Sequence, residues 1–365
     1  MTTGGDDPQI AAEASESDDE TPVRLVFTLQ HDLDKRLDRY LVDRVPTLSR
    51  TQIQRLIEER SVLVNGRLPK ASTHLRKGDC VEAILPPPPS DETPADDIPL
   101  EILFEDDDLI VLNKQAGLIV HPARSHKRGT LVNALAWHFQ HVSAGSLSTV
   151  GKEFARPGVV HRLDKWTTGV MVAAKSDTAH WRLAKQFERR TTGKRYLAIV
   201  HGQPEPEMDR IDLPLGKHHT IREMYAVRWD ETGKPSQTIF RVRERYKDFS
   251  LVEVELLTGR THQIRVHMSH LGWPLAGDDL YGGKHFSEAD LGISKEATRM
   301  VLDRQALHAS WLSFEHPLTP RPLGFTAPLP DDFRIVVRAL RSRGYTTVDP
   351  KGCTLDLGLL GIPRS

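Results

Sequence analysis

The stretch that decides the fold runs from residue 158 to residue 172 and reads GVVHRLDKWTTGVMV. Asp164 stands alone between an apolar run and a Thr-Thr-Gly turn that leads into the next apolar run. This pattern predicts a carboxylate on a loop at the edge of a sheet, where functional groups concentrate. The residues alone leave two interpretations of Asp164: a functional carboxylate, or a turn residue that hydrogen-bonds its own backbone.

The sequence on both sides of this stretch mixes strand and helix patterns. Val252, Val254 and Leu256 alternate with glutamates, as in a half-exposed strand. Further apolar patterns predict strands at residues 109–112 and 170–174 and helices after Thr130, over 179–187, from Thr261 at its N-cap to Gly272, and over 335–340. The regular alternation typical of a parallel sheet is missing, so we expect an α+β fold with a mixed or antiparallel central sheet flanked by helices.

The chain divides into five segments by composition. Residues 1–22 are acidic and lack apolar periodicity, which predicts disorder. Residues 23–85 predict a small unit of two helices, the second with a capping box from Ser49 to Gln52, followed by strands around a turn at Asn65-Gly66. We expect a Pro-rich acidic linker at 86–99, a large domain at 100–333 and a C-terminal extension at 334–365.

Charge and composition narrow the class of protein. The net charge is −1, but residues 1–22 hold seven acids and no base, so the rest of the chain has a net charge of +6. A basic body permits a polyanionic partner. Two cysteines and the lack of an apolar leader or a long apolar run favour a cytoplasmic protein without disulfides or a membrane span.

Three ordered motifs carry a resemblance that the spacing alone does not. The stretch around Asp164 resembles the H-R-L-D-x-x-T-S-G signature of the RluA family of RNA pseudouridine synthases. Two later segments are similar to further motifs of that family, namely KRYLAIVHG (194–202) and LTGRTHQIRVHM (257–268). The resemblance covers nearly all of residues 100–330 and implies the pseudouridine synthase fold.

The resemblance also implies roles for individual residues. It assigns Asp164 as the catalytic carboxylate, Arg265 as its ionic partner and Tyr196 as the ring beside the target uracil. Arg162 matches a position that fills the space left by a flipped nucleotide. We expect His161, Thr168 and Gly169 to shape the loop. Whether the carboxylate attacks the sugar, attacks the base or assists removal of a ribose proton stays open.

A second resemblance covers the N-terminal unit. Residues 36–41, 49–57 and 62–66 are similar to the S4 RNA-binding domain. In that family the second helix meets RNA, which implies Arg50, Arg55 and Lys77 as RNA contacts. Together with the larger domain, this unit is closest to family members that modify large-subunit ribosomal RNA.

The reaction implied by the resemblance sets the expected partners. Pseudouridine formation moves the sugar bond from N1 to C5 without oxidation or a leaving product, so we expect no cofactor and no metal. The histidines at 262, 267 and 270 lack a recognised ligand spacing. The expected partner is RNA, most of all large-subunit ribosomal RNA. Two alternatives remain: a tRNA-modifying member of the same family, and a non-catalytic RNA-binding protein.

Overall fold

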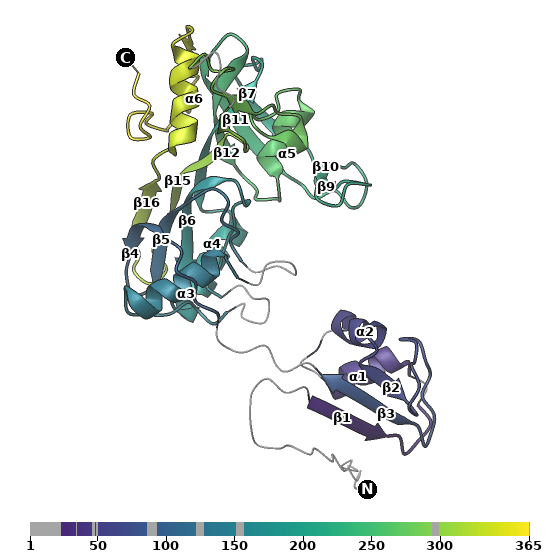
Figure 1. Ribbon diagram of the computed structural model, residues 1–365. Helices are drawn as coiled ribbons and strands as arrows, with labels where there is room; N and C mark the ends of the chain where they lie inside the picture. Colours follow the sequence, from purple (N-terminus) through teal and green to yellow (C-terminus); the bar gives the residue numbers. More distant parts are fainter. Residues whose placement is uncertain are drawn as a thin grey trace. The chain divides into compact units, whose positions relative to one another are not determined.

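The computed structural model describes residues 23–33, 35–45, 48, 50–85, 93–121, 128–150, 157–293 and 299–364 (Figure 1). The chain forms two compact units, residues 1–92 and 93–365. The expected acidic tail, the capping box at Ser49 and residues 86–92 of the expected linker lie outside the described residues. None of the described helices is long and apolar enough to cross a membrane.

The N-terminal unit packs two helices on a three-stranded antiparallel sheet with the strand order β1-β3-β2. Its elements are β1 (Val23–Thr28), α1 (Leu37–Arg44), α2 (Arg50–Glu58), β2 (Val62–Val64) and β3 (Cys80–Leu85). Asn65 and Gly66 both have positive φ, and residues 64 and 67 exchange backbone hydrogen bonds across them, which confirms the expected tight turn. The sequence analysis missed β1, which pairs with β3 along its whole length.

The second unit is built on a ten-stranded sheet within the described residues. Its main path runs β17-β11-β12-β7-β15-β6-β5-β4, with β16 paired to β15 and β8 paired to β11. The pair β6–β15 is parallel and the other pairs are antiparallel, so the expected mixed sheet is confirmed. The strands are β4 (Glu101–Glu105), β5 (Leu109–Lys114), β6 (Thr168–Ala174), β7 (Gly193–His201), β8 (Met208–Asp212), β11 (Gln237–Arg245), β12 (Phe249–Leu256), β15 (Leu307–Glu315), β16 (Pro322–Thr326) and β17 (Thr346–Thr347).

Helices and short hairpins complete this unit. The helices are α3 (Leu131–His141), α4 (Asp177–Arg189), α5 (Gln263–His270), α6 (Asp331–Arg341) and the 3-10 turn η2 (Asp279–Tyr281). Two small hairpins pair β9 (Leu215–Lys217) with β10 (Tyr225–Val227), and β13 (Phe286–Ser287) with β14 (Met300–Leu302). The helix expected after Thr130 is α3, with Thr130 as its N-cap residue and the Thr130 backbone N–H donating to the Asn133 side chain.

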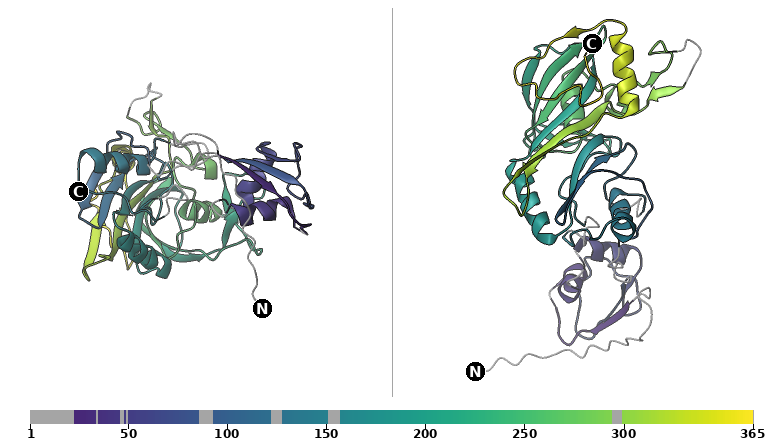
Figure 2. Two further views of the ribbon diagram at one scale, coloured as in Figure 1. Left: turned by 90° about the horizontal axis from the view of Figure 1, so that it is seen from below. Right: turned by 90° about the vertical axis from the view of Figure 1, so that its left-hand side faces the viewer.

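Strand β7 shows how the sheet is covered on both faces. Tyr196, Ala198 and Val200 belong to the core that α3, α4 and α5 cover, whereas Leu197 and Ile199 belong to the core that α6 covers. Figure 1 accordingly shows α6 and α5 on opposite sides of the sheet, and the right-hand view of Figure 2 shows α6, in yellow, beside the strands. The sheet is therefore a middle layer flanked by helices, as expected.

One expectation about β12 is wrong. The alternation at residues 252–256 predicts exposed glutamates, but Glu253 is fully buried. Its carboxylate accepts hydrogen bonds from Arg243, from the Thr354 hydroxyl and backbone N–H, and from the Leu355 backbone N–H. The physical reason is that the C-terminal residues cover the face of the sheet that the alternation assigns to solvent.

The C-terminal residues are part of the second unit. The helix expected at 335–340 begins earlier, at Asp331, and runs to Arg341. After it, Leu355, Leu357, Leu360 and Ile362 are buried in the same core as α6. At the other end of this unit, Pro94 and Asp96 of the expected linker hydrogen-bond to Asn133 of α3.

Candidate active site

A cleft of about 480 Å³ opens where β7, the end of α4, the start of α5 and the loop before β6 meet. This volume lies in the range of pockets that hold small ligands. Five cationic side chains line the cleft against two acidic ones; they are Arg162, Arg190, Lys194, Arg260 and Arg265, against Asp164 and Glu188. The wall is thus suited to an anionic ligand.

Asp164 lies on the loop that leads into β6, with its side chain 20% exposed. Lys114 holds this loop through a hydrogen bond from its Nζ to the backbone carbonyl of Lys165 at 3.0 Å. The same Nζ donates to the backbone carbonyls of Gln115 and Leu118, each at 2.9 Å. Lys114 has no exposed surface, and burial lowers its pKa to about 7. The sequence analysis assigned it no role, although a lysine ending a buried apolar strand marks an unusual position.

Two nitrogens face the same oxygen of Asp164. Arg265 Nη1 lies 3.4 Å and His262 Nε2 lies 3.8 Å from Oδ2. Within the described part of the chain, Oδ1 accepts no hydrogen bond. The two oxygens of Asp164 therefore differ. Oδ2 faces Arg265 and His262, and Oδ1 is available to a ligand.

Arg265 has a closer partner than Asp164. Its Nε and Nη2 donate to the two oxygens of Asp278, each at 2.7 Å, and its guanidinium carbon lies 4.8 Å from the centre of the Tyr281 ring. Asp278 is fully buried. Burial of Arg265 alone would lower its pKa, but the hydrogen bonds and negative charge of Asp278 outweigh this effect and raise it. Asp278 therefore occupies the fork of the guanidinium, and Asp164 contacts the remaining nitrogen, Nη1, as a second ionic partner. The sequence analysis missed Asp278.

The expected helix around Arg265 also begins later than predicted. Thr261 is not its N-cap; His262 occupies that position with φ 55°, in the left-handed region. Ile264 and Met268 are buried, whereas Leu271 follows the last helical residue, His270, and is exposed.

Tyr196 lines the cleft from β7 and is almost fully buried. Burial, together with the negative charge of Asp164, raises the pKa of its hydroxyl above the ordinary value. Its phenol therefore remains protonated at neutral pH and offers a hydrogen-bond donor beside a flat ring.

The remaining expected site residues fall into two groups. Arg162 is exposed and lines the cleft, and His161 stacks on Phe187 with ring centres 4.5 Å apart. His161 Nε2 accepts the backbone N–H of Val172, and burial lowers the pKa of the ring to about 3. Thr168 and Gly169 instead lie inside the sheet.

The position of Gly169 explains the loop geometry. A side chain there would place its Cβ 2.2 Å from the carbonyl oxygen of Ala309, at the parallel contact of β6 with β15. The neighbouring Thr168 Oγ1 lies 2.8 Å from Nδ1 of the buried His308. Both residues therefore fix the strand that follows Asp164 and do not face the cleft.

The histidines considered for a metal do not converge in the structure. His267 is buried, with Nδ1 2.9 Å from the Thr238 hydroxyl and Nε2 3.0 Å from the carbonyl oxygen of Leu213. His262 Nδ1 lies 2.7 Å from the Tyr281 hydroxyl. The rings of His262 and His267 therefore hydrogen-bond to different partners.

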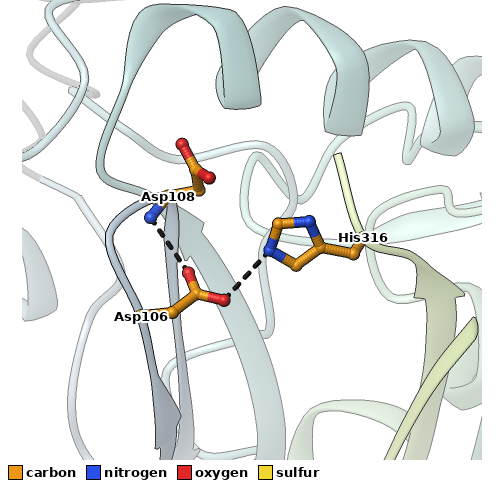
Figure 3. Close-up of side chains that lie close together, drawn as sticks. All are labelled: Asp106, Asp108 and His316. Atoms are coloured by element: carbon orange, nitrogen blue, oxygen red, sulfur yellow. Dashed lines mark hydrogen bonds and ion pairs between the residues drawn. The ribbon is translucent and has the colours of Figure 1, made fainter. Parts of the chain in front are cut away.

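A different cluster brings Asp106, Asp108 and His316 together (Figure 3). Asp106 Oδ1 accepts the backbone N–H of Asp108, and Asp106 Oδ2 lies 3.0 Å from His316 Nε2. His316 Nδ1 accepts two backbone N–H groups, so Nε2 carries the proton and donates to Asp106. These hydrogen bonds join the β4–β5 turn to the loop after β15.

The expected RNA contacts of the N-terminal unit differ in their surroundings. Arg50 donates to the fully buried carboxylate of Asp38, which Arg36 also contacts. Arg55 forms an ion pair with Glu59, and the Lys77 backbone N–H donates to Asp32. Arg50 keeps 48% of its side chain exposed, and Arg55 and Lys77 are exposed as well.

Comparison with known proteins identifies the class to which this fold and site belong. The sequence profile of the RNA pseudouridylate synthase family matches residues 108–270, and that of the S4 domain matches residues 35–81. The first range contains Asp164, Tyr196 and Arg265.

Individual relatives make the assignment firm. An uncharacterized RNA pseudouridine synthase of Chlorobaculum parvum is 42% identical over 84% of this chain and 94% of its own. Ribosomal large subunit pseudouridine synthase D of Vibrio parahaemolyticus is 40% identical over 85% of this chain and 92% of its own. The solved structure of human RNA pseudouridylate synthase domain containing 4 superposes with a TM-score of 0.52 at 26% identity, covering 66% of this chain and 93% of that one. The chain belongs to the RNA pseudouridine synthase family and carries an N-terminal S4 domain.

Proposed function

We propose that this enzyme isomerises uridines of large-subunit ribosomal RNA to pseudouridine, with Asp164 as the catalytic carboxylate. The observation that carries the proposal is the single carboxylate oxygen, Oδ1, left open in a cleft with an excess of cations. In the reaction the C1′–N1 bond breaks, a C1′–C5 bond forms, and a proton moves from C5 to N1. A carboxylate is the group that glycosidic chemistry uses at the sugar carbon.

The other cleft residues supply binding and orientation. A uridine must leave its stack to reach Asp164, and an aromatic wall such as Tyr196 suits a flipped base. Arg162 lies exposed on the same loop as Asp164, where it can fill the space of the extruded nucleotide. Arg265 Nη1 lies 3.4 Å from Oδ2 and orients the carboxylate.

The choice of RNA rests on the relatives and on the S4 domain. Synthase D of Vibrio parahaemolyticus is named for the large ribosomal subunit and aligns over both units of this chain. The exposed basic residues Arg50, Arg55 and Lys77 support phosphate contacts outside the cleft. We place this activity in the cytoplasm, where both free cysteines stay reduced.

The deciding experiment measures tritium release from C5-labelled uridine in large-subunit ribosomal RNA. We expect release with the wild type and none with Asp164→Asn, which keeps the shape of the side chain and removes its charge. Release from tRNA but not from ribosomal RNA would overturn the substrate and keep the chemistry. The absence of release from either RNA would overturn the activity.

The S4 contribution has its own test. Lys77→Glu and Arg55→Glu should raise the KM for ribosomal RNA and flatten its salt dependence, because each removes a phosphate contact. Their kcat should match the wild type, since both residues lie in the other compact unit from Asp164. An unchanged KM in both variants would remove these residues from the RNA interface.

A further inference from the structure

His262 lines the cleft and belongs to the quoted segment 257–268, but the roles assigned to Asp164, Tyr196 and Arg265 do not include it. It lies at the N-cap of α5 with φ 55° and ψ 19°, a backbone conformation that non-glycine residues rarely adopt. Such outliers persist where the surrounding structure holds them, often at functional sites. The side chain lines the cleft and points Nε2 toward Asp164 Oδ2, at 3.8 Å.

The hydrogen-bond network fixes which ring nitrogen carries the proton. The backbone N–H of Tyr225 donates to the Tyr281 hydroxyl oxygen at 2.9 Å, and that hydroxyl lies 2.7 Å from His262 Nδ1. Among the described residues the hydroxyl proton of Tyr281 has no other acceptor, so it points to Nδ1. The neutral ring then carries its proton on Nε2, the nitrogen that faces Asp164.

The surroundings keep this tautomer neutral. Burial lowers the pKa of His262, with Asp164 and Asp278 opposing and Arg265 and Arg162 assisting this shift. The rings of Tyr225 and Tyr281 pack edge-on against the imidazole, each with centres 5.6 Å apart. Burial also raises the pKa of Tyr281 to about 12, so its hydroxyl remains a donor at neutral pH.

We propose that His262 is a positioning residue that donates Nε2–H to Oδ2 of Asp164 in the substrate complex, with the Tyr281 hydroxyl setting its tautomer. Together with Arg265 it turns Oδ2 away from the nucleotide and leaves Oδ1 as the reacting oxygen. The present distance is longer than a hydrogen bond, as is common before a substrate closes the site. The proposal rests on the proposed synthase function and adds a residue to it.

Two substitutions of His262 separate the effect of the Nε2–H donor from the effect of the left-handed backbone conformation. Asparagine tolerates the left-handed conformation and places its amide near Nδ1, so His262→Asn keeps the turn but cannot reach Asp164. Glutamine places an N–H near the position of Nε2, so His262→Gln restores the donor. We expect His262→Asn to lower the single-turnover rate about 10- to 100-fold, the range of a lost hydrogen bond to a charged group. His262→Gln should recover most of that loss, and the affinity for RNA should change little in either variant.

A second measurement reads the tautomer without any RNA. Long-range ¹H–¹⁵N spectra of the full-length protein at pH 7 distinguish the two neutral forms, and the His262→Asn spectrum assigns the signal. We expect the Nε2–H form in the wild type and a mixture of both forms in Tyr281→Phe, which should also slow turnover.

The outcomes decide the proposal in each case. Wild-type rates in His262→Asn, or equal losses in the Asn and Gln variants with intact spectra, would overturn it. The Nδ1–H form in the wild type would overturn it as well. If the wild type modifies no RNA, the proposed function fails, and the tautomer spectrum still tests the assignment at His262.

Discussion

Replacing Asp278 with asparagine should destabilise the second unit, because Asp278 is the main counter-charge of Arg265. Both side chains are buried, at 0% and 8% exposure, and two hydrogen bonds of 2.7 Å join them. Without the negative charge, Arg265 is a buried cation whose nearest carboxylate oxygen is that of Asp164, 3.4 Å away. Breaking one side of such a pair costs about 3 kcal/mol. Activity should fall as well, because the fork at Asp278 sets the direction of Nη1.

The assay is urea unfolding followed by tryptophan fluorescence. All six tryptophans lie between residues 137 and 311, so the emission reports only on the second unit. Asp279→Asn is a matched control: it removes the same charge one residue later, where the side chain is 79% exposed. We expect the control to change stability by less than about 0.5 kcal/mol. An equal, small effect of both substitutions would refute the reasoning that Asp278 holds Arg265.

Three further predictions follow from buried contacts. Hydrogen bonds from Lys175, Ser143 and His138 outweigh burial and lower the pKa of Glu105 from 4.5 to about 2. The Glu105 carboxylate therefore contributes about 3 kcal/mol to the free energy of unfolding above pH 4.5, and this contribution is lost as the pH falls toward 2. Glu105→Gln should make the free energy of unfolding less dependent on pH in this range. Gly169→Ala should prevent the close approach of β6 and β15 and lower the thermal midpoint, whereas unchanged melting would contradict the 2.2 Å contact with Ala309. Lys114→Met should cost about 2–4 kcal/mol, since three buried carbonyls lose their donor, and circular dichroism during urea unfolding measures this loss.

Local patterns predicted much of the fold. The apolar run at 109–112, the Thr130 cap and the helix over 179–187 appear in the structure because each depends on neighbouring residues. Strand β1 escaped prediction because its partner, β3, lies more than fifty residues later and its own pattern is short. The half-exposed interpretation of β12 failed for a related reason: residues 354 and 355 cover Glu253 from about a hundred positions away.

The candidate site was predictable only where residues belong to motifs. Asp164, Tyr196 and Arg265 stand in the three quoted segments, and the structure gathers all three around one cleft. Asp278 and Lys114 could not be found in this way, because their importance comes from burial beside another charge or beside carbonyl groups. Periodicity reports which face of an element is apolar, but it does not report which buried polar groups meet.

The buried carboxylate of Glu253 has a consequence for how the protein is made. Its hydrogen-bond donors at residues 354 and 355 are synthesised about a hundred residues after Glu253, and Arg364, which binds Glu244 and Asp349, follows them. Until these residues have left the ribosomal exit tunnel, their side of the sheet lacks this cover. The second unit therefore reaches its final packing only after the segment that contains residues 354–364 has emerged.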